Sequence, residues 1–242
     1  MARLVLNTQA FVLHSRPYRE TSLLVDMLTR EQGKLRCVVR GAKSKKSPKV
    51  ALLQPFLPLQ CEFMGSGELR NLGQLDTMGQ SFALAGTNLF CGLYLNELLL
   101  RICPNEYADP MLFDAYQTTL RHLADAQTQW LEALLREFEL YLLQHIGVLG
   151  GLDSEAEGGL DLVDEGCYHY QLGIGVIACM PSVKWHFSGR VFTDVANQIW
   201  HEQSLLCAKI ICRQVITDLL GDRPLKSREL FKTLRPYSKS SD

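Results

Sequence analysis

The chain has 242 residues, and its apolar share of 47% is large enough to form hydrophobic cores, which excludes a chain that is disordered throughout. Its net charge of -1 conceals an uneven distribution. Residues 1–80 hold twelve Lys or Arg against six Asp or Glu, whereas residues 153–165 hold six acidic residues and no basic one. Charge segregated in this way indicates a polyanionic partner for the first part of the chain.

Residues 10–78 have the pattern of short strands separated by turns. Pro17 is expected to end the first strand, and Pro55 and Pro58 confine the fourth to an edge or bulged position. We expect strands at residues 10–14, 21–29, 34–39, 52–63 and 69–75, although the leucines of residues 21–29 would also permit a helix. About five short strands with a basic face suggest a small closed or partly open barrel.

From about residue 80 the pattern becomes helical, with apolar residues at i, i+3, i+4 and i+7 steps. We expect helices at residues 88–102, 110–123 and 127–146, strand-like or irregular chain at 167–187, and further helices from about 193, over 203–220 and near 224–234. The predicted class is α+β multidomain. An N-terminal barrel domain would span residues 1–79 and a helical domain residues 80–242, with an irregular insertion at about 150–190.

The run from Arg40 to Lys49 (RGAKSKKSPK) carries five positive charges and no acidic residue. Gly41, Pro48 and the serines interrupt any helical periodicity. We interpret the run as a mobile cationic arm that follows a phosphate backbone. A run of this kind can also be a solvated loop that only keeps a sheet edge soluble.

Other basic residues of the N-terminal part are expected to join this arm. Lys34 and Arg36 share one face of a predicted strand, and Arg16 and Arg19 lie in the adjacent connection. Aromatic residues are few here, so we expect backbone electrostatics to dominate over base stacking. The candidate DNA-binding residues are Arg16, Arg19, Lys34, Arg36, Arg40, Lys43, Lys45, Lys46 and Lys49.

Motifs of enzymes and metal sites are not found. The sequence has no Walker-type loop, no GxSxG elbow and no HExxH, so we expect no catalytic residues and no cofactor. Cys167 lies near His169, and Cys179 lies near His186, but neither cysteine belongs to a CxxC pair of the kind that holds structural zinc. We therefore expect no bound metal.

The eight cysteines are scattered, and most lie within apolar runs. No secretory leader is recognisable, and no apolar stretch approaches the length of a membrane span. We therefore expect reduced thiols in a cytoplasmic, nucleoid-associated protein that has no membrane partner.

Arg136 lies in the helix expected at residues 127–146, next to apolar residues. A lone arginine beside an apolar stripe usually extends to solvent. Alternatively, it is a cation at the mouth of an apolar groove, which would suit a peptide carboxylate with an adjacent aromatic side chain.

Five segments resemble the bacterial recombination mediator RecO family, in family order and across nearly the whole chain. They are residues 10–22 (AFVLHSRPYRETS), 40–45 (RGAKSK), 53–56 (LQPF), 92–98 (GLYLNEL) and 226–231 (KSRELF). The resemblance implies an N-terminal OB-fold joined to a helical C-terminal domain. It also implies binding of single- and double-stranded DNA and annealing of complementary strands.

As partners the resemblance implies RecR, the C-terminal tail of the single-stranded-DNA-binding protein SSB and, indirectly, RecA, which the family helps to load onto coated DNA. Arg136 matches the helix position that family members use to hold the acidic SSB tail. Many members also carry a four-cysteine zinc module, of which only Cys179 matches here. The alternative function is a protein-binding adaptor without intrinsic DNA affinity, in which the lysine-rich loop serves solubility alone.

Overall fold

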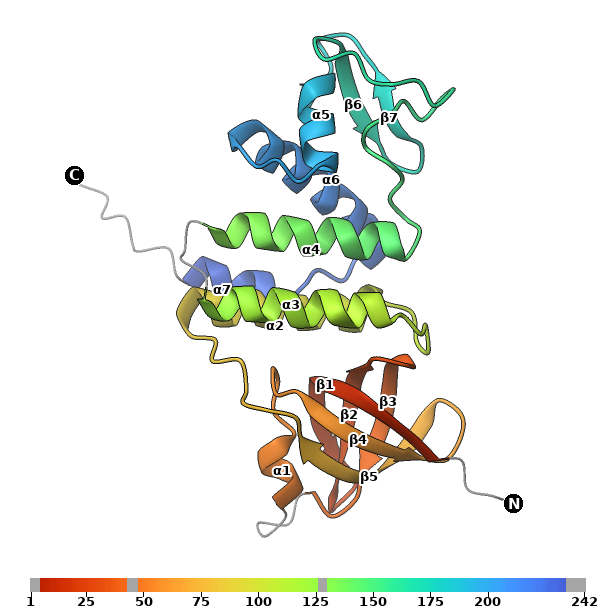
Figure 1. The fold of residues 1–242 in the computed structure, drawn as a ribbon, viewed down its shortest axis with the longest axis vertical. Helices are drawn as coiled ribbons and strands as arrows, with labels where there is room; N and C mark the ends of the chain where they lie inside the picture. The colour runs from red at the N-terminus through yellow and green to blue at the C-terminus, as the bar shows by residue number, and fades with distance from the viewer. Residues whose placement is uncertain (1–4, 43–47, 126–129, 234–242) are drawn as a thin grey trace, which may run out of the picture. The chain divides into compact units, whose positions relative to one another are not determined.

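The computed structural model describes residues 5–42, 48–125 and 130–233 (Figure 1). The chain forms two compact units. One comprises Met1–Thr128 and Leu225–Asp242 and is called the barrel unit below; the other comprises Gln129–Pro224 and is called the helix–sheet unit. The expected domain boundary after residue 79 stays a prediction.

The barrel unit begins with five strands that close into a barrel in the order β1-β2-β3-β5-β4, which confirms the expected OB-type barrel. The strands are β1 (Val5–Tyr18), β2 (Ser22–Thr29), β3 (Gly33–Val39), β4 (Leu59–Met64) and β5 (Leu69–Thr77). A short helix, α1 (Pro48–Leu52), connects β3 to β4. The pairs are antiparallel except for β3 and β5, which run parallel where the barrel closes.

Alternation of apolar and polar residues decides which side chains fill the barrel. On β3, Leu35, Cys37 and Val39 are buried, and on β4 every second residue is buried in the same way. The inward side chains form one core that comprises Ala10, Val12, Val25, Met27, Leu35, Cys37, Val39, Ala42, Leu53, Leu57, Leu59, Cys61, Phe63, Leu72 and Leu75.

Two strands differ from expectation. β1 does not end at Pro17 but continues to Tyr18, because its first half pairs with β4 and its second half with β2, with a register shift between Val12 and His14. Closing the barrel requires this long shared strand. The fourth strand starts only after Pro58, since prolines cannot donate to the ladder, and part of the preceding chain forms α1.

Helices α2 (Gly86–Ile102), α3 (Pro110–Asp125) and α7 (Ser227–Thr233) complete the barrel unit. The ring of Phe11, on the outer side of β1, lies 5.3 Å from that of Tyr116 on α3. The Tyr116 hydroxyl donates to the side-chain oxygen of buried Asn96 on α2, and the Asn96 amide nitrogen lies 3.4 Å from the carbonyl oxygen of Leu13. Polar contacts at the β1 irregularity therefore hold α2 and α3 against the barrel.

In the helix–sheet unit, the region expected to be strand-like forms a three-stranded sheet in the order β7-β6-β8. Its elements are α4 (Leu131–His145), β6 (Cys167–Gln171), β7 (Gly175–Ala178), β8 (Phe187–Ser188), α5 (Gly189–Ala196) and α6 (Glu202–Leu220). A barrel followed by helices with a small inserted sheet confirms the expected α+β class. None of the helices in the described ranges has both the length and the apolar character of a membrane span.

Candidate nucleic-acid interface

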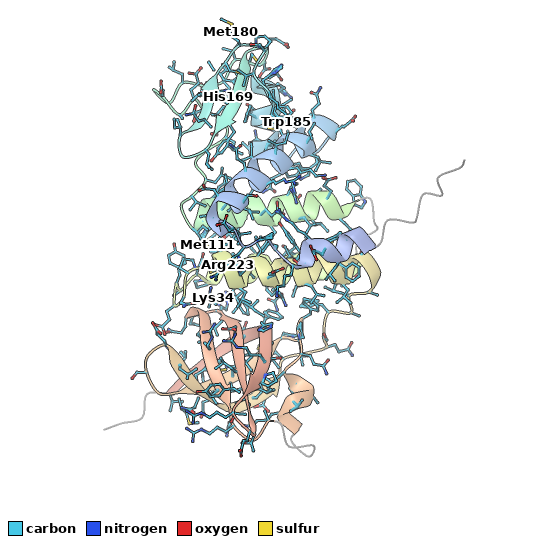
Figure 2. All side chains as sticks on the ribbon, turned by 180° about the vertical axis from the view of Figure 1, so that it is seen from behind. Lys34, Met111, His169, Met180, Trp185 and Arg223 are labelled. Carbon is cyan, nitrogen blue, oxygen red and sulfur yellow. The ribbon has the colours of Figure 1, made fainter. Side chains whose placement is uncertain are left out.

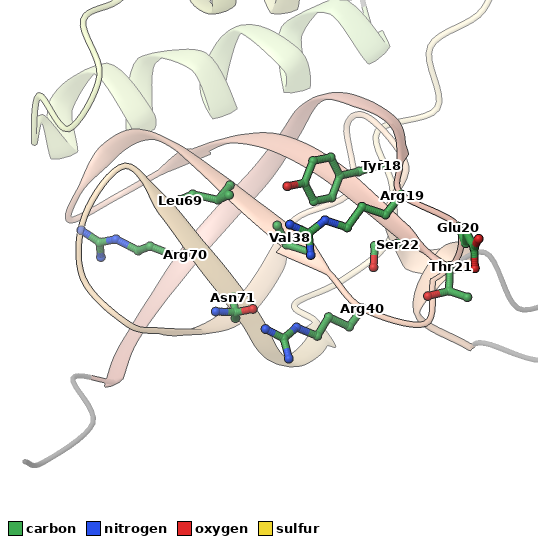
Figure 3. A pocket seen from close by; sticks show the side chains of 10 residues that line it. All are labelled: Tyr18, Arg19, Glu20, Thr21, Ser22, Val38, Arg40, Leu69, Arg70 and Asn71. Atoms are coloured by element: carbon green, nitrogen blue, oxygen red, sulfur yellow. The ribbon is translucent and has the colours of Figure 1, made fainter.

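A groove of about 640 Å³ lies on the outer face of the barrel (Figure 3). Its lining comes from the turn between β1 and β2, from the end of β3 and from the start of β5. We call it the barrel groove, and its lining residues are Tyr18, Arg19, Glu20, Thr21, Ser22, Val38, Arg40, Leu69, Arg70 and Asn71.

Strand pairing explains why these distant residues meet. Val38 on β3 pairs with Asn71 on the parallel strand β5, and Tyr18 pairs with Ser22 at the end of the β1–β2 hairpin. Residues paired across a ladder point to the same face of the sheet. In barrels of the OB type, the face of the second and third strands and the adjoining loops bind oligonucleotides.

Two of the predicted DNA-binding residues, Arg19 and Arg40, line the groove, and both are exposed. Arg19 occupies a left-handed backbone conformation (φ 51°) in the β1–β2 turn. Its guanidinium carbon lies 5.2 Å from the centre of the Tyr18 ring, within cation–π range. Arg70 also lines the groove, but its guanidinium lies 3.3 Å from Glu106 and points away from the other side chains (Figure 3).

Arg16 and Arg36 lie on the same outer face as the groove. Arg16 is exposed and pairs with Leu24, which in turn pairs with the groove residue Val38. Arg36 has 47% of its side chain exposed, but its Nε lies 2.6 Å from a carboxylate oxygen of buried Asp26. The positive charge of Arg36 is therefore partly balanced by a neighbour on the same face.

The structure corrects the expectation for Lys34, which does not present its ammonium on this face (Figure 2). Its Nζ donates to the carbonyl oxygen of Leu100 over 2.8 Å, and its own carbonyl accepts from the Glu106 backbone over 2.8 Å. Burial lowers the pKa of this ammonium. The chain after α2 covers Lys34, although the strand alternation places it on the outer side together with Arg36.

Only part of the Arg40–Lys49 run can be placed. Lys49 belongs to helix α1, contrary to the non-helical interpretation of the run, and its Nζ donates to the carbonyl oxygen of Gly73 over 2.6 Å. Lys49 is therefore held against β5 rather than extended as part of an arm. Lys43, Lys45 and Lys46 lie outside the described residues.

Sequence reasoning missed the apolar part of the groove. Leu69 is 45% exposed, and Tyr18 and Val38 are half-buried beside it. Strand alternation in the sequence assigns Val38 to the outer face together with Arg36, but it does not place Leu69, because Leu69, Leu72 and Leu75 recur at every third residue. It could not show that they share a groove with Tyr18, because the parallel pairing of β3 with β5 brings them together.

The structure also corrects the surroundings expected for Arg136. Only 11% of its side chain is exposed, and its Nη2 donates to Glu139 over 2.7 Å within the helix–sheet unit. Glu139 is 1% exposed and interacts with Cys212 on α6, whose pKa is raised by burial. Arg136 is thus part of a buried polar contact between α4 and α6. Its role in holding an SSB tail stays a prediction.

An apolar groove with cations does exist in the helix–sheet unit, with a volume of about 580 Å³. Exposed Lys184 and Arg213 flank aromatic side chains, and the Lys184 ammonium lies 5.4 Å from the centre of the Trp185 ring. The buried Nδ1 of His169 has no hydrogen-bond partner among the described residues. We call this surface the aromatic groove; its lining includes His169, Tyr170, Lys184, Trp185, Phe187 and Arg213.

The two cysteines weighed as metal ligands are neighbours at the base of the β6–β7 hairpin. The sulfur atoms of Cys167 and Cys179 lie 3.5 Å apart. Burial, with the neighbouring Cys167, raises the pKa of Cys179 to about 11. Within the described ranges, no third histidine, cysteine, aspartate or glutamate joins them in a group that could hold a metal ion.

The chain matches two family descriptions in succession. Residues 1–80 match "Recombination protein O N terminal", and residues 84–229 match "Recombination protein O C terminal". A solved structure of asparaginyl-tRNA synthetase from Entamoeba histolytica, in complex with asparaginyl-adenylate, covers 75% of this chain and 40% of its own at 13% identity. Its TM-score of 0.28 is too low to bear on fold or function.

Curated relatives match over nearly their full length. "DNA repair protein RecO" of Pseudoalteromonas atlantica is 43% identical over 230 residues, which is 92% of each chain. The protein of the same name from Alteromonas mediterranea is 38% identical and covers 93% of this chain and 96% of its own. That of Escherichia coli is 39% identical over 94% of each chain. The chain therefore belongs to the Recombination protein O (RecO) family of DNA repair proteins.

Proposed function

We propose that the chain is a non-enzymatic recombination mediator that binds single- and double-stranded DNA and anneals complementary strands. With RecR and SSB it helps to load RecA onto single-stranded DNA. Membership of the RecO family supports the proposal, and so does the position of the barrel groove on the face that OB-type barrels use for oligonucleotides.

The observation that carries the DNA-binding part is the exposure of Arg19 and Arg40 in the barrel groove, with Arg16 on the same face. Guanidinium groups neutralise phosphates and release counterions, and this term supplies most of non-specific DNA affinity. Two strands held on one cationic surface repel each other less, so base pairing between them nucleates more readily. Half-exposed Arg36 contributes less, because Asp26 already balances its charge.

A fluorescence annealing assay with two complementary strands tests this proposal. The variant Arg19→Gln/Arg40→Gln removes two groove cations, and Arg30→Gln/Arg121→Gln removes two arginines of the barrel unit that do not line the groove. We expect the groove variant to anneal roughly tenfold more slowly at low salt. For binding to single strands, the slope of log affinity against log salt concentration should become less steep by about 0.7 for each phosphate that the variant no longer neutralises. The control variant should keep the parental slope.

A protein-binding adaptor without DNA affinity is the alternative. It predicts that neither the parent nor any variant binds DNA in a salt-dependent manner. Equal slopes in the parent and in the groove variant would remove the barrel groove from the proposal, and the absence of any salt-dependent binding would favour the adaptor.

For the SSB tail, the proposal uses the aromatic groove as the docking surface. A flexible acidic peptide with an apolar end requires cations beside an apolar recess, and Lys184 and Arg213 flank the aromatic side chains in this arrangement. Arg136, which was expected to hold the tail directly, is bonded to Glu139 instead. In this proposal Arg136 positions α6, the helix that carries Arg213, by way of the Glu139–Cys212 contact.

A further inference from the structure

The lining of the barrel groove is partly cationic and partly apolar, and phosphate binding accounts only for the cationic part. Arg19 and Arg40 are the exposed cations of its lining, whereas Glu20 adds a negative charge and Arg70 is bonded to Glu106. The rest of the surface includes Val38, half-buried in β3, and Leu69, 45% exposed in β5. A phosphate gains nothing from an exposed leucine, so the apolar part of the groove suits a flat, weakly hydrated group.

Tyr18 supplies a flat surface next to this apolar part. The guanidinium carbon of Arg19 lies 5.2 Å from the centre of its ring, so tyrosine and arginine form a cation–π pair in the groove lining (Figure 3). The pair is held where the chain reverses direction, with Arg19 in the left-handed conformation and Tyr18 still paired with Ser22. Aromatic rings and guanidinium planes are the surfaces on which proteins stack unpaired bases.

Polar side chains accompany this surface. The Asn71 carboxamide both donates and accepts hydrogen bonds, and the Ser22 hydroxyl lies in the same lining (Figure 3). Base edges carry donors and acceptors that such groups can meet. The groove volume of about 640 Å³ falls within the range of about 300–1,000 Å³ that is usual for small-ligand sites.

We infer that the barrel groove binds an unpaired nucleobase, which stacks on the Tyr18–Arg19 pair and covers Leu69 and Val38, while Arg40 contacts the neighbouring phosphate. The inference rests on the proposed DNA-binding function and extends it from the phosphate backbone to the bases. A duplex keeps its bases stacked and paired, so it cannot enter the groove without base flipping. The site therefore favours single strands and loses its hold on a strand as that strand pairs.

The test compares two oligonucleotides of equal length and charge, one of thymidines and one of abasic nucleotides, by fluorescence anisotropy at several salt concentrations. We expect the parental protein to bind the thymidine strand about tenfold more tightly. Tyr18→Leu should remove this preference and leave the salt dependence unchanged, whereas Tyr18→Phe, which retains the ring, should keep it. A quenched 2-aminopurine signal that is lost in Tyr18→Leu would place the base on the ring.

A second pair of variants guards against effects on folding. Leu69→Ser changes an exposed strand residue inside the groove, and Val5→Ser changes a strand residue of similar exposure, 49% against 45%, that does not line it. Only Leu69→Ser should reduce the preference for bases. Salt-dependent binding that is equal for the two oligonucleotides would overturn the base site and leave the proposed function standing. The absence of any salt-dependent binding would overturn both.

Discussion

The carboxylate of Glu97 on α2 caps the N-terminus of α7 at Ser227. One carboxylate oxygen accepts from the Ser227 backbone over 2.7 Å and from its hydroxyl over 2.6 Å, and the other accepts from the Lys226 backbone over 2.9 Å. Arg101, one turn further along α2, lies 3.9 Å from the same carboxylate. A residue 130 positions away in sequence thus satisfies backbone donors that a helix usually caps with its own side chains.

Glu97→Ala should therefore loosen α7 locally. We expect a loss of about 1 kcal/mol, the usual effect of removing a helix cap, seen as faster hydrogen exchange of the α7 amides. Glu68→Ala, in the turn between β4 and β5, is the control and should leave exchange in α7 unchanged. Unaltered exchange in Glu97→Ala would mean that the cap does not stabilise the helix.

The stabilisation of α7 by the Glu97 carboxylate should also depend on pH. Burial alone would raise the pKa of Glu97, but hydrogen bonds from Ser227 and Lys226 and the charge of Arg101 hold that pKa below its ordinary value of 4.5. A carboxylate of this kind stabilises the folded state above its unfolded pKa, and the stabilisation is lost as the pH falls through the folded pKa. The difference in α7 exchange between the parent and Glu97→Gln should thus be full at pH 7 and shrink on acidification below pH 4.5.

Lys34 should matter for stability and not for DNA binding. Lys34→Met keeps most of the apolar stem but removes the ammonium that donates to Leu100, so the Leu100 carbonyl loses this donor. We expect a loss of about 1 kcal/mol in unfolding free energy, with DNA affinity changed less than twofold. Arg40→Met serves as the comparison and should show the reverse. If the Lys34 variant binds DNA as poorly as Arg40→Met and unfolds like the parent, Lys34 contacts DNA after all.

Asp26 should moderate the charge of the DNA-binding face. Asp26→Asn leaves Arg36 without its charged partner and raises the net charge of the outer face by one. We expect tighter binding to single strands and a salt slope steeper by about 0.7, as for one additional neutralised phosphate. Asp114→Asn releases Arg30, which does not line the groove, and is the matched control. If both variants steepen the slope equally, the effect reflects overall charge and not the position of Arg36.

A substitution in the aromatic groove should affect peptide binding, whereas a substitution of Arg136 should affect stability. Arg213→Gln removes an exposed cation of the groove lining and should weaken binding of an SSB tail peptide by about tenfold, with unfolding unchanged. Arg136→Gln removes the positive charge that faces buried Glu139 and should destabilise the protein by about 3 kcal/mol. Titration calorimetry and urea unfolding distinguish the two. A stably folded Arg136 variant that no longer binds the peptide would restore the direct contact that the resemblance implied.

The barrel was predictable because its signal is local. Leu35, Cys37 and Val39 alternate with outward residues over a single strand, and the glycine turns mark where strands end. The groove could not be predicted in this way, because its lining residues come from distant parts of the sequence. Tyr18 and Leu69 are fifty-one positions apart in the numbering, and only the ladders that join β1, β2, β3 and β5 place them beside one surface.

The sequence by itself shows the strand and helix periods and the excess of basic residues in the first eighty positions. It also shows the family that its segments resemble. Tertiary structure alone decided which of those basic residues are exposed. Lys34 and Arg36 are equivalent by alternation, yet the last turn of α2 binds the ammonium of Lys34, while Arg36 keeps about half of its side chain in solvent. The reason is physical: periodicity determines the direction of a side chain, whereas its exposure and charge balance depend on segments that pack there from elsewhere in the chain.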